Sequence, residues 1–570
     1  MAEYFSPGVY VEEYDNSPRS IEGVGTSTAG FIGFAEKGPV EGAPLLVTNM
    51  KSFRQQFGGF LSEFAFGEYR FLANSVEQFF DNGGTRCYVM RVAPKDAVSA
   101  KADKGILTVE AANPGKWGNK IQVIMALGKK HKLQLTKKTD TGFIAKNLDG
   151  FREGDLVEFQ GTYNKIKTIF DNEVTFEEKL PDSAVDAGIV PKNLLYLVTV
   201  DISVKYGDDV ENYSELSFNM ASPRYIDAKL ATSNLVKVQV KPVEKAGNPV
   251  ESIFGKGNTS GMFVLEGGSD GSMAKVNSGT FIGEDNGPGK RTGIQAFLEN
   301  NTVSMMAIPG ITTPEIIVAL VAHCENLRSR FAVIDMPGEM TKTADLIQYR
   351  QIIDSTYAAM YHPWIQVYDR SSNKLDYIPP SGAVMGIYSR TDVNRGVHKA
   401  PANEVIFCTG LKVNYTKDEQ DVLNPEGINL IRALPGQGIR VWGARTASSN
   451  SNFKYVNVRR LFIFVEESIK ANTNWVVFEP NDASLWQRVS LTISNFLDNL
   501  WRNGMLAGDS VSDSYFVEIG ASTMSRDDIM NGRLICNIGI APSRPAEFVI
   551  FRVTQHTAEA GGGGGEGEEG

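Results

Sequence analysis

Residues 304–335 read SMMAIPGITTPEIIVALVAHCENLRSRFAVID, and their pattern decides the fold. Two short, largely apolar runs, Ser304–Ile308 and Phe331–Asp335, flank the segment Pro314–Arg328, whose apolar residues recur at helical spacing. A strand, a helix and a strand in this order predict an α/β unit. The same alternation continues on both sides, with a predicted helix at Ile294–Asn300 and another at Thr341–Thr356. Ala358–Tyr368 follows as a further predicted strand.

An earlier part of the chain shows the same alternation. Gly23–Phe34 mixes small residues with β-formers, which predicts a buried strand in a tightly packed sheet. Glu63–Asp81 has the three-and-four spacing of an amphipathic helix, and Arg86–Val92 is a predicted strand. Residues 20–95 therefore belong to the same type of fold as residues 294–368.

The segment between these two parts has a different pattern. From residue 101 to about residue 240, short alternating segments are separated by Gly, Asn and Asp turns, which predicts a mostly β insertion. Pro223–Ala231 is the single helix expected there, and the glycine turn Leu265–Gly271 marks the return to alternating helix and strand. An α/β domain interrupted by an insertion explains this order.

The closing part is expected to contain one long amphipathic helix. Pro480, Asn481 and Asp482 supply a start signal, an apolar stripe runs through Ala483–Asn503, and Gly504 ends it. Trp475–Phe478 before it is a predicted strand, and further strands close the chain. Arg488, Asp498 and Arg502 lie at or beyond the margins of the stripe. They are either solvated charges or a charged face presented to a partner.

Both ends of the chain have the pattern of extended strands. Residues 541–554 read APSRPAEFVIFRVT, and Phe548–Val553 is apolar on both faces, as expected of a strand covered on both sides. Near the start, Val9–Tyr14 alternates between Pro7 and Pro18. Such strands either complete this chain's own sheet or add to another subunit, and the pattern leaves both interpretations open.

Bulk composition narrows the class of protein. The 570 residues are 42% apolar, 22% charged and 10% aromatic, which is the composition of a globular protein of three or four domains. The formal net charge of −10 argues against binding nucleic acid through its phosphates. We find no basic leader and no apolar run of roughly 20 residues, so a soluble protein made in the cytoplasm is expected. Residues 561–570 contain only glycine and glutamate, and disorder is expected there.

Catalytic and metal-binding patterns are weak. The four cysteines show no CxxC spacing and the five histidines no metal-ligand spacing, so no cofactor or metal is expected. The glycine-rich turns do not match a phosphate-binding loop, and no GxSxG is present. Asp335 and Asp369 follow predicted strands, where α/β enzymes place active sites, but a lone acidic residue there more often caps a helix or turn.

Several motifs, in order, resemble the contractile tail sheath proteins of myophages, pyocin-like particles and related contractile injection systems. The resemblance spans nearly the whole chain except about residues 130–215, and its C-terminal part is the most specific. The matching segments are Ser6–Glu13, Gly23–Gly33 with Gly38-Pro39, Asn82–Val92, Pro114–Asn119, Tyr455–Leu461, Phe478–Asp482 with Leu485-Trp486, and Gly532–Phe551.

The resemblance implies a structural, non-enzymatic subunit. Such subunits stack as hexameric rings around an inner tube, and terminal arms add strands to a neighbour's C-terminal domain. The expected arm residues are Val9, Tyr10, Val11, Tyr14, Phe548, Val549, Ile550, Phe551 and Val553. Arg488, Asp498 and Arg502 become the predicted contact with the tube, although the region near Arg526 and Arg533 could serve instead. The sheath itself, the inner tube, baseplate proteins and the tail terminator are the expected partners, without nucleic acid or direct membrane insertion.

The expected fold is thus a multidomain α+β/α/β arrangement: a discontinuous α/β core, a mostly β insertion, and a C-terminal α+β domain with extended terminal strands. Its divisions are an arm (1–20), a core (21–100 plus 265–410), a surface insertion (101–264), a C-terminal domain (411–557) and a tail (558–570). The expected location is a phage virion tail or an injection particle assembled in the bacterial cytoplasm. Two alternatives remain: an α/β hydrolytic enzyme with a β insertion, and a non-contractile coat or tube protein.

Overall fold

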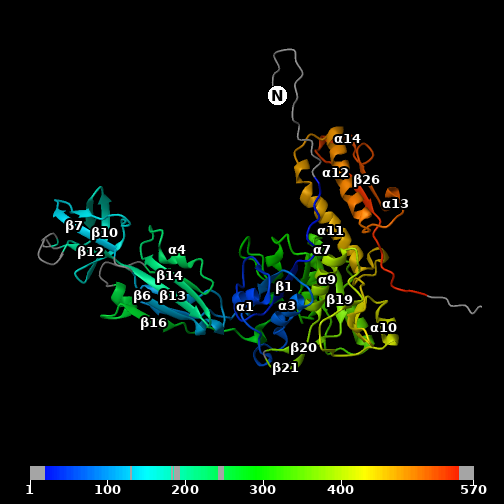
Figure 1. Ribbon diagram of the computed structural model, residues 1–570, viewed down its shortest axis with the longest axis horizontal. Helices are drawn as coiled ribbons and strands as arrows, with labels where there is room; N and C mark the ends of the chain where they lie inside the picture. The colour runs from blue at the N-terminus through cyan, green and yellow to red at the C-terminus, as the bar shows by residue number, and fades with distance from the viewer. Residues whose placement is uncertain are drawn as a thin grey trace, which may run out of the picture.

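A nine-stranded sheet forms the centre of the molecule (Figure 1). The computed structural model describes residues 20–128, 131–180, 184, 193–241, 249–370 and 372–550. The sheet order is β2 (Leu45–Val47), β3 (Cys87–Arg91), β1 (Ala29–Gly33), β17 (Met305–Ala307), β18 (Phe331–Asp335), β19 (Ala358–His362), β24 (Ile428–Leu434), β25 (Gly438–Val441) and β22 (Glu404–Val405). The six strands from β3 to β24 are parallel, and the flanking strands are antiparallel.

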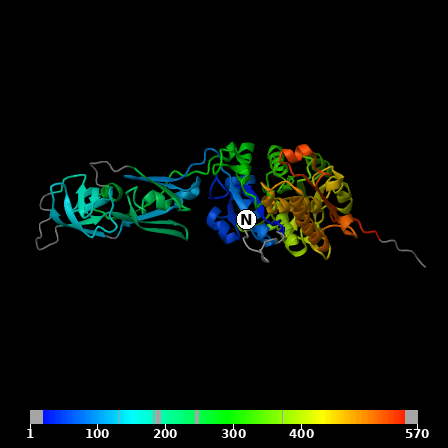
Figure 2. The ribbon, with the colours of Figure 1, turned by 90° about the horizontal axis from the view of Figure 1, so that it is seen from above.

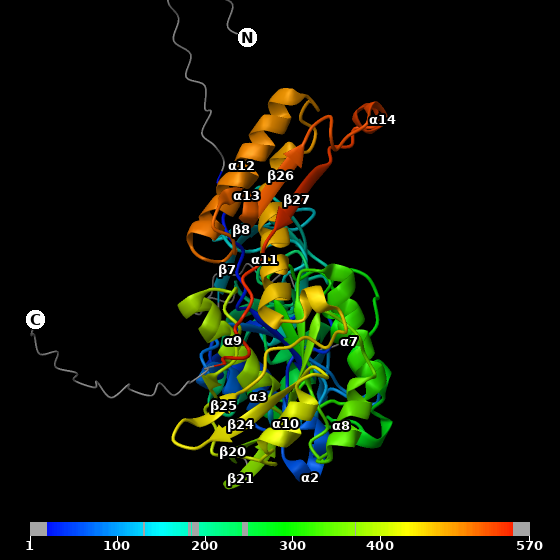
Figure 3. The ribbon, with the colours of Figure 1, turned by 90° about the vertical axis from the view of Figure 1, so that its right-hand side faces the viewer.

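Helices cover both faces of this sheet, so its strands are buried on both sides. One apolar cluster joins the sheet to α1 (Met50–Phe57), α3 (Leu72–Asp81) and α9 (Ser381–Arg395). A second joins the opposite face to α7 (Pro314–Leu327), α8 (Thr343–Arg350) and α10 (Lys417–Leu423). Figure 3 shows α3 and α9 on one side of the sheet and α7 and α8 on the other. The α/β core that the alternating pattern predicted is therefore a doubly wound domain.

The segment between β3 and β17 contributes three further sheets that extend away from the core (Figures 1 and 2). The first is β15 (Val236–Val240), β5 (Leu107–Ala111) and β4 (Lys101–Lys104); the second is β14 (Asp209–Ser217), β13 (Thr199–Tyr206), β6 (Gln122–Leu127) and β16 (Ser260–Val264). The third is a closed barrel of β10 (Thr162–Phe170), β11 (Glu173–Phe176), β8 (Phe143–Lys146), β7 (His131–Lys138), β12 (Leu194–Leu197) and β9 (Leu156–Phe159). Two short helices, α4 (Ile226–Leu230) and α5 (Pro249–Phe254), belong to this segment.

Two long helices and a hairpin form the C-terminal part. The elements are α11 (Val456–Asn472), α12 (Ala483–Arg502), α13 (Val511–Ser514), β26 (Tyr515–Ile519), α14 (Arg526–Met530) and β27 (Cys536–Ile540). A separate apolar cluster joins α11, α12 and the hairpin, and it includes Ile21 from the start of the chain. The remaining elements are α2 (Glu63–Phe66), α6 (Ser278–Ile282) and a small sheet of β21 (Lys374–Ile378), β20 (Ile365–Asp369) and β23 (Gly410–Leu411).

Four sequence expectations need correction. The predicted strand Trp475–Phe478 is a 3-10 turn at Asn474–Val476, because the short connection between α11 and α12 has to reverse the chain. Glu63–Asp81 is interrupted at Gly67, which ends α2 with a φ of 53°. Ile294–Asn300 forms only a 3-10 turn at Gly293–Phe297. Ala358–Tyr368 is two strands in different sheets, β19 and β20.

The expected boundary at residue 410 is also too early. Strands β24 and β25 follow this position, yet both belong to the nine-stranded sheet. The chain leaves this domain along α11, which contributes Val456 and Ile463 to the cluster of the sheet domain and Leu461 and Val465 to the C-terminal apolar cluster. Local patterning does not reveal this because β24 pairs with β19, which lies about 70 residues earlier in the chain (Met360 opposite Ile428).

Candidate assembly site

The hairpin of β26 and β27 has two open edges. Each strand pairs only with the other within the described part of the chain, from Tyr515 opposite Ile540 to Ile519 opposite Cys536. One face of the hairpin, which includes Val517 and Ile538, packs with α12 in the C-terminal cluster. Its outer N–H and C=O groups have no strand beside them, so the hairpin can accept an added strand along either edge.

Helix α12 supports the hairpin from one side (Figure 3). The helix starts at the predicted position, with Asp482 as its N-cap: the Asp482 carboxylate accepts a hydrogen bond from the Leu485 amide at 2.9 Å. The predicted apolar stripe is buried, and Leu485, Val489 and Leu497 are among its members. The sequence therefore predicted both the start and the buried face of this helix.

The predicted tube contacts lie at opposite ends of α12. Arg488 is half exposed, pairs with Glu479 at 3.1 Å and lies 5.4 Å from the centroid of the Trp475 ring. Asp498 and Arg502 form an ion pair one helical turn apart at 2.7 Å, near the other end. Fourteen residues separate the two arginines, which corresponds to about 20 Å along a helix. The structure thus brings Asp498 and Arg502 together but not Arg488.

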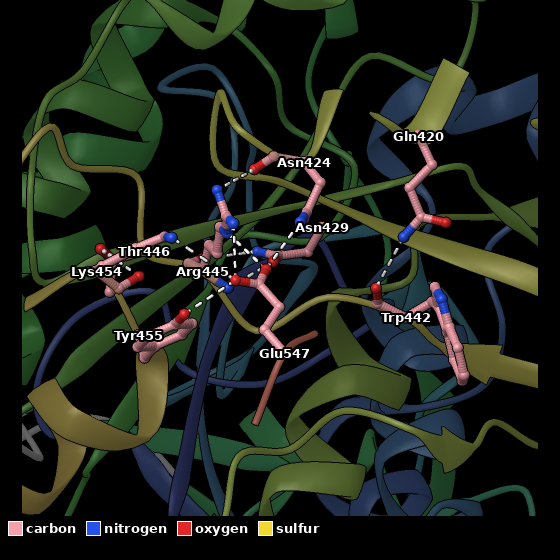
Figure 4. Close-up of polar contacts among 9 residues, drawn as sticks. All are labelled: Gln420, Asn424, Asn429, Trp442, Arg445, Thr446, Lys454, Tyr455 and Glu547. Carbon is pink, nitrogen blue, oxygen red and sulfur yellow. Dashed lines mark hydrogen bonds and ion pairs between the residues drawn. The ribbon is translucent and has the colours of Figure 1, made fainter. Parts of the chain in front are cut away.

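The start of the C-terminal arm is fastened by Glu547 (Figure 4). Its carboxylate accepts hydrogen bonds from Arg445 Nε and Nη2, both at 2.7 Å, from Asn424 Nδ2 at 2.8 Å and from the Tyr455 hydroxyl at 2.9 Å. Lys454 Nζ lies 3.7 Å away. Burial by itself raises the pKa of Glu547, but the hydrogen bonds from Arg445, Asn424 and Tyr455 outweigh it and lower the pKa to about 2.

Arg445 is held in place by its own neighbours. Its backbone amide donates to Asn429 Oδ1 at 2.7 Å, and its carbonyl accepts from Asn429 Nδ2 at 2.8 Å. Its Nη1 donates to the Asn424 carbonyl at 3.1 Å. Asn429 is fully buried on β24, so the clamp that holds Glu547 is built onto the nine-stranded sheet. We call Arg445, Asn424, Tyr455 and Glu547 the arm clamp.

The chain between the hairpin and the arm clamp is tied down along its length. The Ala541 amide donates to the Ser514 carbonyl at 2.8 Å, and Ala541 in turn accepts from Ala507. Asn457 Nδ2 donates to the Ser543 carbonyl at 3.2 Å. Beyond Glu547 these ties end: Phe548, Val549 and Ile550 belong to no strand and are 72%, 67% and 79% exposed.

The predicted C-terminal strand is not paired within the described part of the chain. Phe548, Val549 and Ile550 were expected in a strand covered on both sides, but no part of the described chain covers them. These apolar side chains can be buried only by something other than the described residues of this chain. The other predicted arm residues, Val9, Tyr10, Val11, Tyr14, Phe551 and Val553, lie outside the described residues, as does the tail 558–570.

The N-terminal segment joins the main body beside α11. Ile21 is buried in the C-terminal cluster, and the Val24 amide donates to Ser468 Oγ at 3.0 Å. Thr26 Oγ1 donates to Asp392 at 2.7 Å, and the Asp392 carboxylate also pairs with Arg460 at 2.6 Å. This contact joins the N-terminal segment, α9 and α11. Sequence reasoning missed it because Arg460 lies 68 residues from Asp392 and 434 residues from Thr26 in the sequence.

The polar residues considered for catalysis have structural partners. Asp335 accepts hydrogen bonds from the Ser381 amide at 2.7 Å, from the Ser381 hydroxyl at 2.6 Å and from the Gly310 amide at 3.1 Å. It therefore caps α9, and burial raises its pKa to about 6. The described residues contain no group of three or more His, Cys, Asp or Glu side chains placed to hold a metal, and no helix of a length and hydropathy suited to crossing a membrane.

The doubly wound domain, the clamped C-terminal segment and the open hairpin can now be compared with known proteins. The sequence profile of the phage tail sheath protein central domain matches residues 286–447, and that of the phage tail sheath C-terminal domain matches residues 448–556. Residues 286–556 therefore match the central and C-terminal domains of phage tail sheath proteins, and the two matched domains meet between β25 and α11.

Individual relatives agree with this assignment. The tail sheath protein of Salmonella phage ViI is 26% identical over 278 residues, which is 43% of this chain and 43% of that protein. The tail sheath protein of Escherichia phage P2 is 26% identical over 283 residues, which is 48% of this chain and 69% of that protein. The matched part therefore spans less than half of the first relative and about two thirds of the second.

Solved structures share the fold over almost the whole chain. The sheath of the extracellular contractile injection system PVC in its contracted state has a TM-score of 0.54 and 21% identity, covering 98% of this chain and 99% of that one. The contracted helical sheath of the anti-feeding prophage has a TM-score of 0.52 and 20% identity, covering 97% and 100%. The sheath tail protein Lin1278 from Listeria innocua has a TM-score of 0.52 and 12% identity, covering 92% and 96%.

Proposed function

We propose that this chain is the structural subunit of a contractile tail sheath. In this proposal it polymerises as stacked hexameric rings around an inner tube, and contraction of the sheath drives the tube through a target envelope. The observation that carries the proposal is the open hairpin β26–β27 beside a clamped C-terminal segment that ends in exposed apolar residues. A donor segment and an acceptor edge on the same chain allow each subunit to link to its neighbours.

The geometry favours a linkage between subunits over one within a subunit. The arm clamp holds Glu547 at the nine-stranded sheet, so the C-terminal arm starts there, away from the free end of its own hairpin (Figure 3). The three residues Phe548, Val549 and Ile550 would form only the beginning of an added strand, and residues 551–557 follow them in the sequence. Strand addition to a neighbour's hairpin would bury these apolar side chains and pair one of the two open edges in one step.

Contraction in this proposal requires no catalytic residue. The extended sheath would be a metastable packing, and new contacts between subunits in the contracted lattice would supply the free energy. Strand-linked arms would keep the lattice connected while the subunits rearrange. A non-enzymatic role agrees with the structural roles of Asp335 and with relatives that are named as sheath proteins.

The proposed partners follow from this role. The inner tube, the baseplate and the tail terminator would contact the two ends and the inner surface of the sheath. With a formal net charge of −10, the chain is not expected to bind nucleic acid. Assembly would take place in the bacterial cytoplasm, and the product would be a phage tail or an injection particle.

Negative-stain electron microscopy of the purified protein tests the proposal. The full-length chain is expected to form striated hollow cylinders, and a chain lacking residues 1–18 or residues 548–570 is expected to lose them. A chain lacking only residues 558–570 is the matched control and is expected to assemble, since it keeps the apolar arm. Monodisperse monomers from the full-length chain would reject the polymer.

A further inference from the structure

Side-chain contacts, in addition to the two covalent connections of the chain, join the β insertion to the nine-stranded sheet domain. The chain leaves this domain after β3 and returns near residue 265. Two covalent connections by themselves would allow the insertion to swing, because domains within one chain move relative to each other unless their interface is well packed. Side-chain contacts at this junction restrict such a movement.

Lys37 crosses from the sheet domain into the insertion. It follows β1, and its side chain is only 4% exposed. Its Nζ lies 3.4 Å from the Asp209 carboxylate and 4.6 Å from the centroid of the Tyr206 ring, both of which belong to the insertion. A buried ammonium requires such partners, because desolvation without them is strongly unfavourable. The Tyr206 hydroxyl in turn donates to Glu36 at 2.9 Å, which is a second contact across the junction.

Arg91 makes the third crossing contact. It ends β3 and is 3% exposed. Its guanidinium donates to the carbonyls of Ala35 and Gly38 in the sheet domain, both at 3.0 Å, and to the carbonyl of Pro114 in the insertion at 2.8 Å. The planar guanidinium thus holds the loop after β1 in the sheet domain and the loop at Pro114 in the insertion in a fixed geometry.

The sequence Pro114–Asn119 supplies the insertion's side of the junction. Gly115 has a φ of 138°, which only glycine adopts readily, and this brings the Pro114 carbonyl to Arg91. Trp117 is buried edge-on against Tyr206, with ring centroids 5.4 Å apart. Asn119 exchanges two hydrogen bonds with Gly268, at 2.7 and 2.9 Å, on the strand of chain that returns to the core.

We propose that Lys37, Arg91, Trp117 and Tyr206 form a rigid joint, so that the sheets β4–β5–β15 and β14–β13–β6–β16 move as one body with the nine-stranded sheet domain. The joint gives a physical role to the motif Pro114–Asn119. It stands on contacts within one subunit and is independent of the proposed function. If the proposed function is correct, any rotation of the sheet domain in the sheath is transmitted unchanged to the insertion.

Distance measurement by double electron–electron resonance tests the joint. Spin labels are placed on the exposed positions Lys256→Cys in the insertion and Lys342→Cys in the sheet domain, with Cys408 and Cys536 replaced by serine. The full chain is diluted with unlabelled protein so that only distances within one subunit are measured. We expect one narrow distance distribution.

Two variants and one control decide the outcome. Lys37→Met keeps most of the side-chain volume but leaves Asp209 without the ammonium, and Trp117→Ala removes the buried ring; each is expected to widen the distribution at least twofold. Lys167→Met, at an exposed position on the barrel, is expected to leave it unchanged. Circular dichroism is used to check that each variant is folded. If Trp117→Ala does not fold, the test rests on Lys37→Met. A broad distribution in the parent protein, or equal widths in the parent and Lys37→Met, would overturn the proposal.

Discussion

Arg445 and Glu547 form a two-point ion pair across 102 residues of sequence, with the Nε–Oε1 and Nη2–Oε2 distances both 2.7 Å. The pair attaches the end of the C-terminal segment to the nine-stranded sheet through Asn429. It therefore determines where the exposed residues that follow leave the subunit. In the proposed sheath, this is the point at which a strand that links two subunits transmits force to the subunit it comes from.

Replacing Glu547 with glutamine should release this segment. We expect the variant to lose about 1–2 kcal/mol of local stability, which corresponds to about 5- to 30-fold faster hydrogen exchange in the peptide 541–547 at neutral pH. The figure is below that of a fully buried pair because solvent screens part of the interaction. Tyr455→Phe removes one hydrogen bond without the charge, and its effect should be smaller. Equal exchange in all three proteins would contradict the clamp.

The same pair should make the segment sensitive to acid. Because the pKa of Glu547 is lower in the folded chain than its ordinary value of 4.5, the stabilisation is complete above pH 4.5 and is lost as the pH falls toward 2. Pepsin cleavage after Phe548, normalised to a free peptide of the same sequence, should rise over this range in the parent protein. In Glu547→Gln it should already be high at pH 5 and change little.

Asp392 and Arg460 form the most deeply buried ion pair described above, each with a side chain only 3% exposed. Asp392→Asn would leave the Arg460 charge without its counter-charge, and we expect a loss of about 3–5 kcal/mol. Differential scanning calorimetry should show this as a lower unfolding temperature. Asp498→Asn breaks the exposed pair with Arg502 and is the matched control, with an expected loss of at most about 1 kcal/mol. Similar losses in the two variants would contradict the assigned burial.

Helix α9 approaches α3 so closely that glycine is required between them. A Cβ on Gly386 would lie 2.5 Å from the Phe79 carbonyl oxygen and 2.9 Å from Asn82 Cβ. Gly386→Ala should therefore destabilise the protein by about 1–3 kcal/mol through overpacking, although alanine favours a helix. Urea titration of the unfolding free energy measures this loss. At Gly59 the nearest atom to such a Cβ is 3.8 Å away, so Gly59→Ala should leave the free energy of unfolding almost unchanged in the same titration.

Charge reversal on α12 tests the predicted contact with the tube. Arg488→Glu with Arg502→Glu should leave the fold intact, since the two side chains are 49% and 70% exposed. If this helix faces the tube, co-sedimentation of the variant with purified tubes should fall at least tenfold. Arg526→Glu with Arg533→Glu, on and beside α14, is the comparison for the alternative surface. Undiminished binding by the α12 variant would remove that helix from the interface.

Much of the fold could be predicted because it depends on local sequence patterns. The βαβ alternation around Phe331–Asp335 and the start of α12 at Asp482 follow from periodicity and capping, which depend on residues only a few positions apart. Helix α9 was missed, since its buried face is made of small residues such as Gly382 and Gly386 and gives no amphipathic signal. The closed barrel was expected only as part of a mostly β insertion, because closure depends on which strands pair.

The candidate site divides in the same way. The apolar run beginning at Phe548 marked the C-terminal arm, whereas Glu547 gave no signal because its partners Arg445, Asn424 and Tyr455 lie about 90 to 120 residues away. The same holds for Lys37, whose neighbours come from the far side of the junction.

By itself, the sequence determined the alternation of helices and strands, the start of α12 and the apolar character of the C-terminal arm, since each depends on neighbours in sequence. Only the tertiary structure decided the extent of the nine-stranded sheet, the open edges of the hairpin, the arm clamp and the joint to the insertion. These depend on pairing and charge contacts between distant segments, and the free energy of such contacts exists only once the chain has brought those segments together.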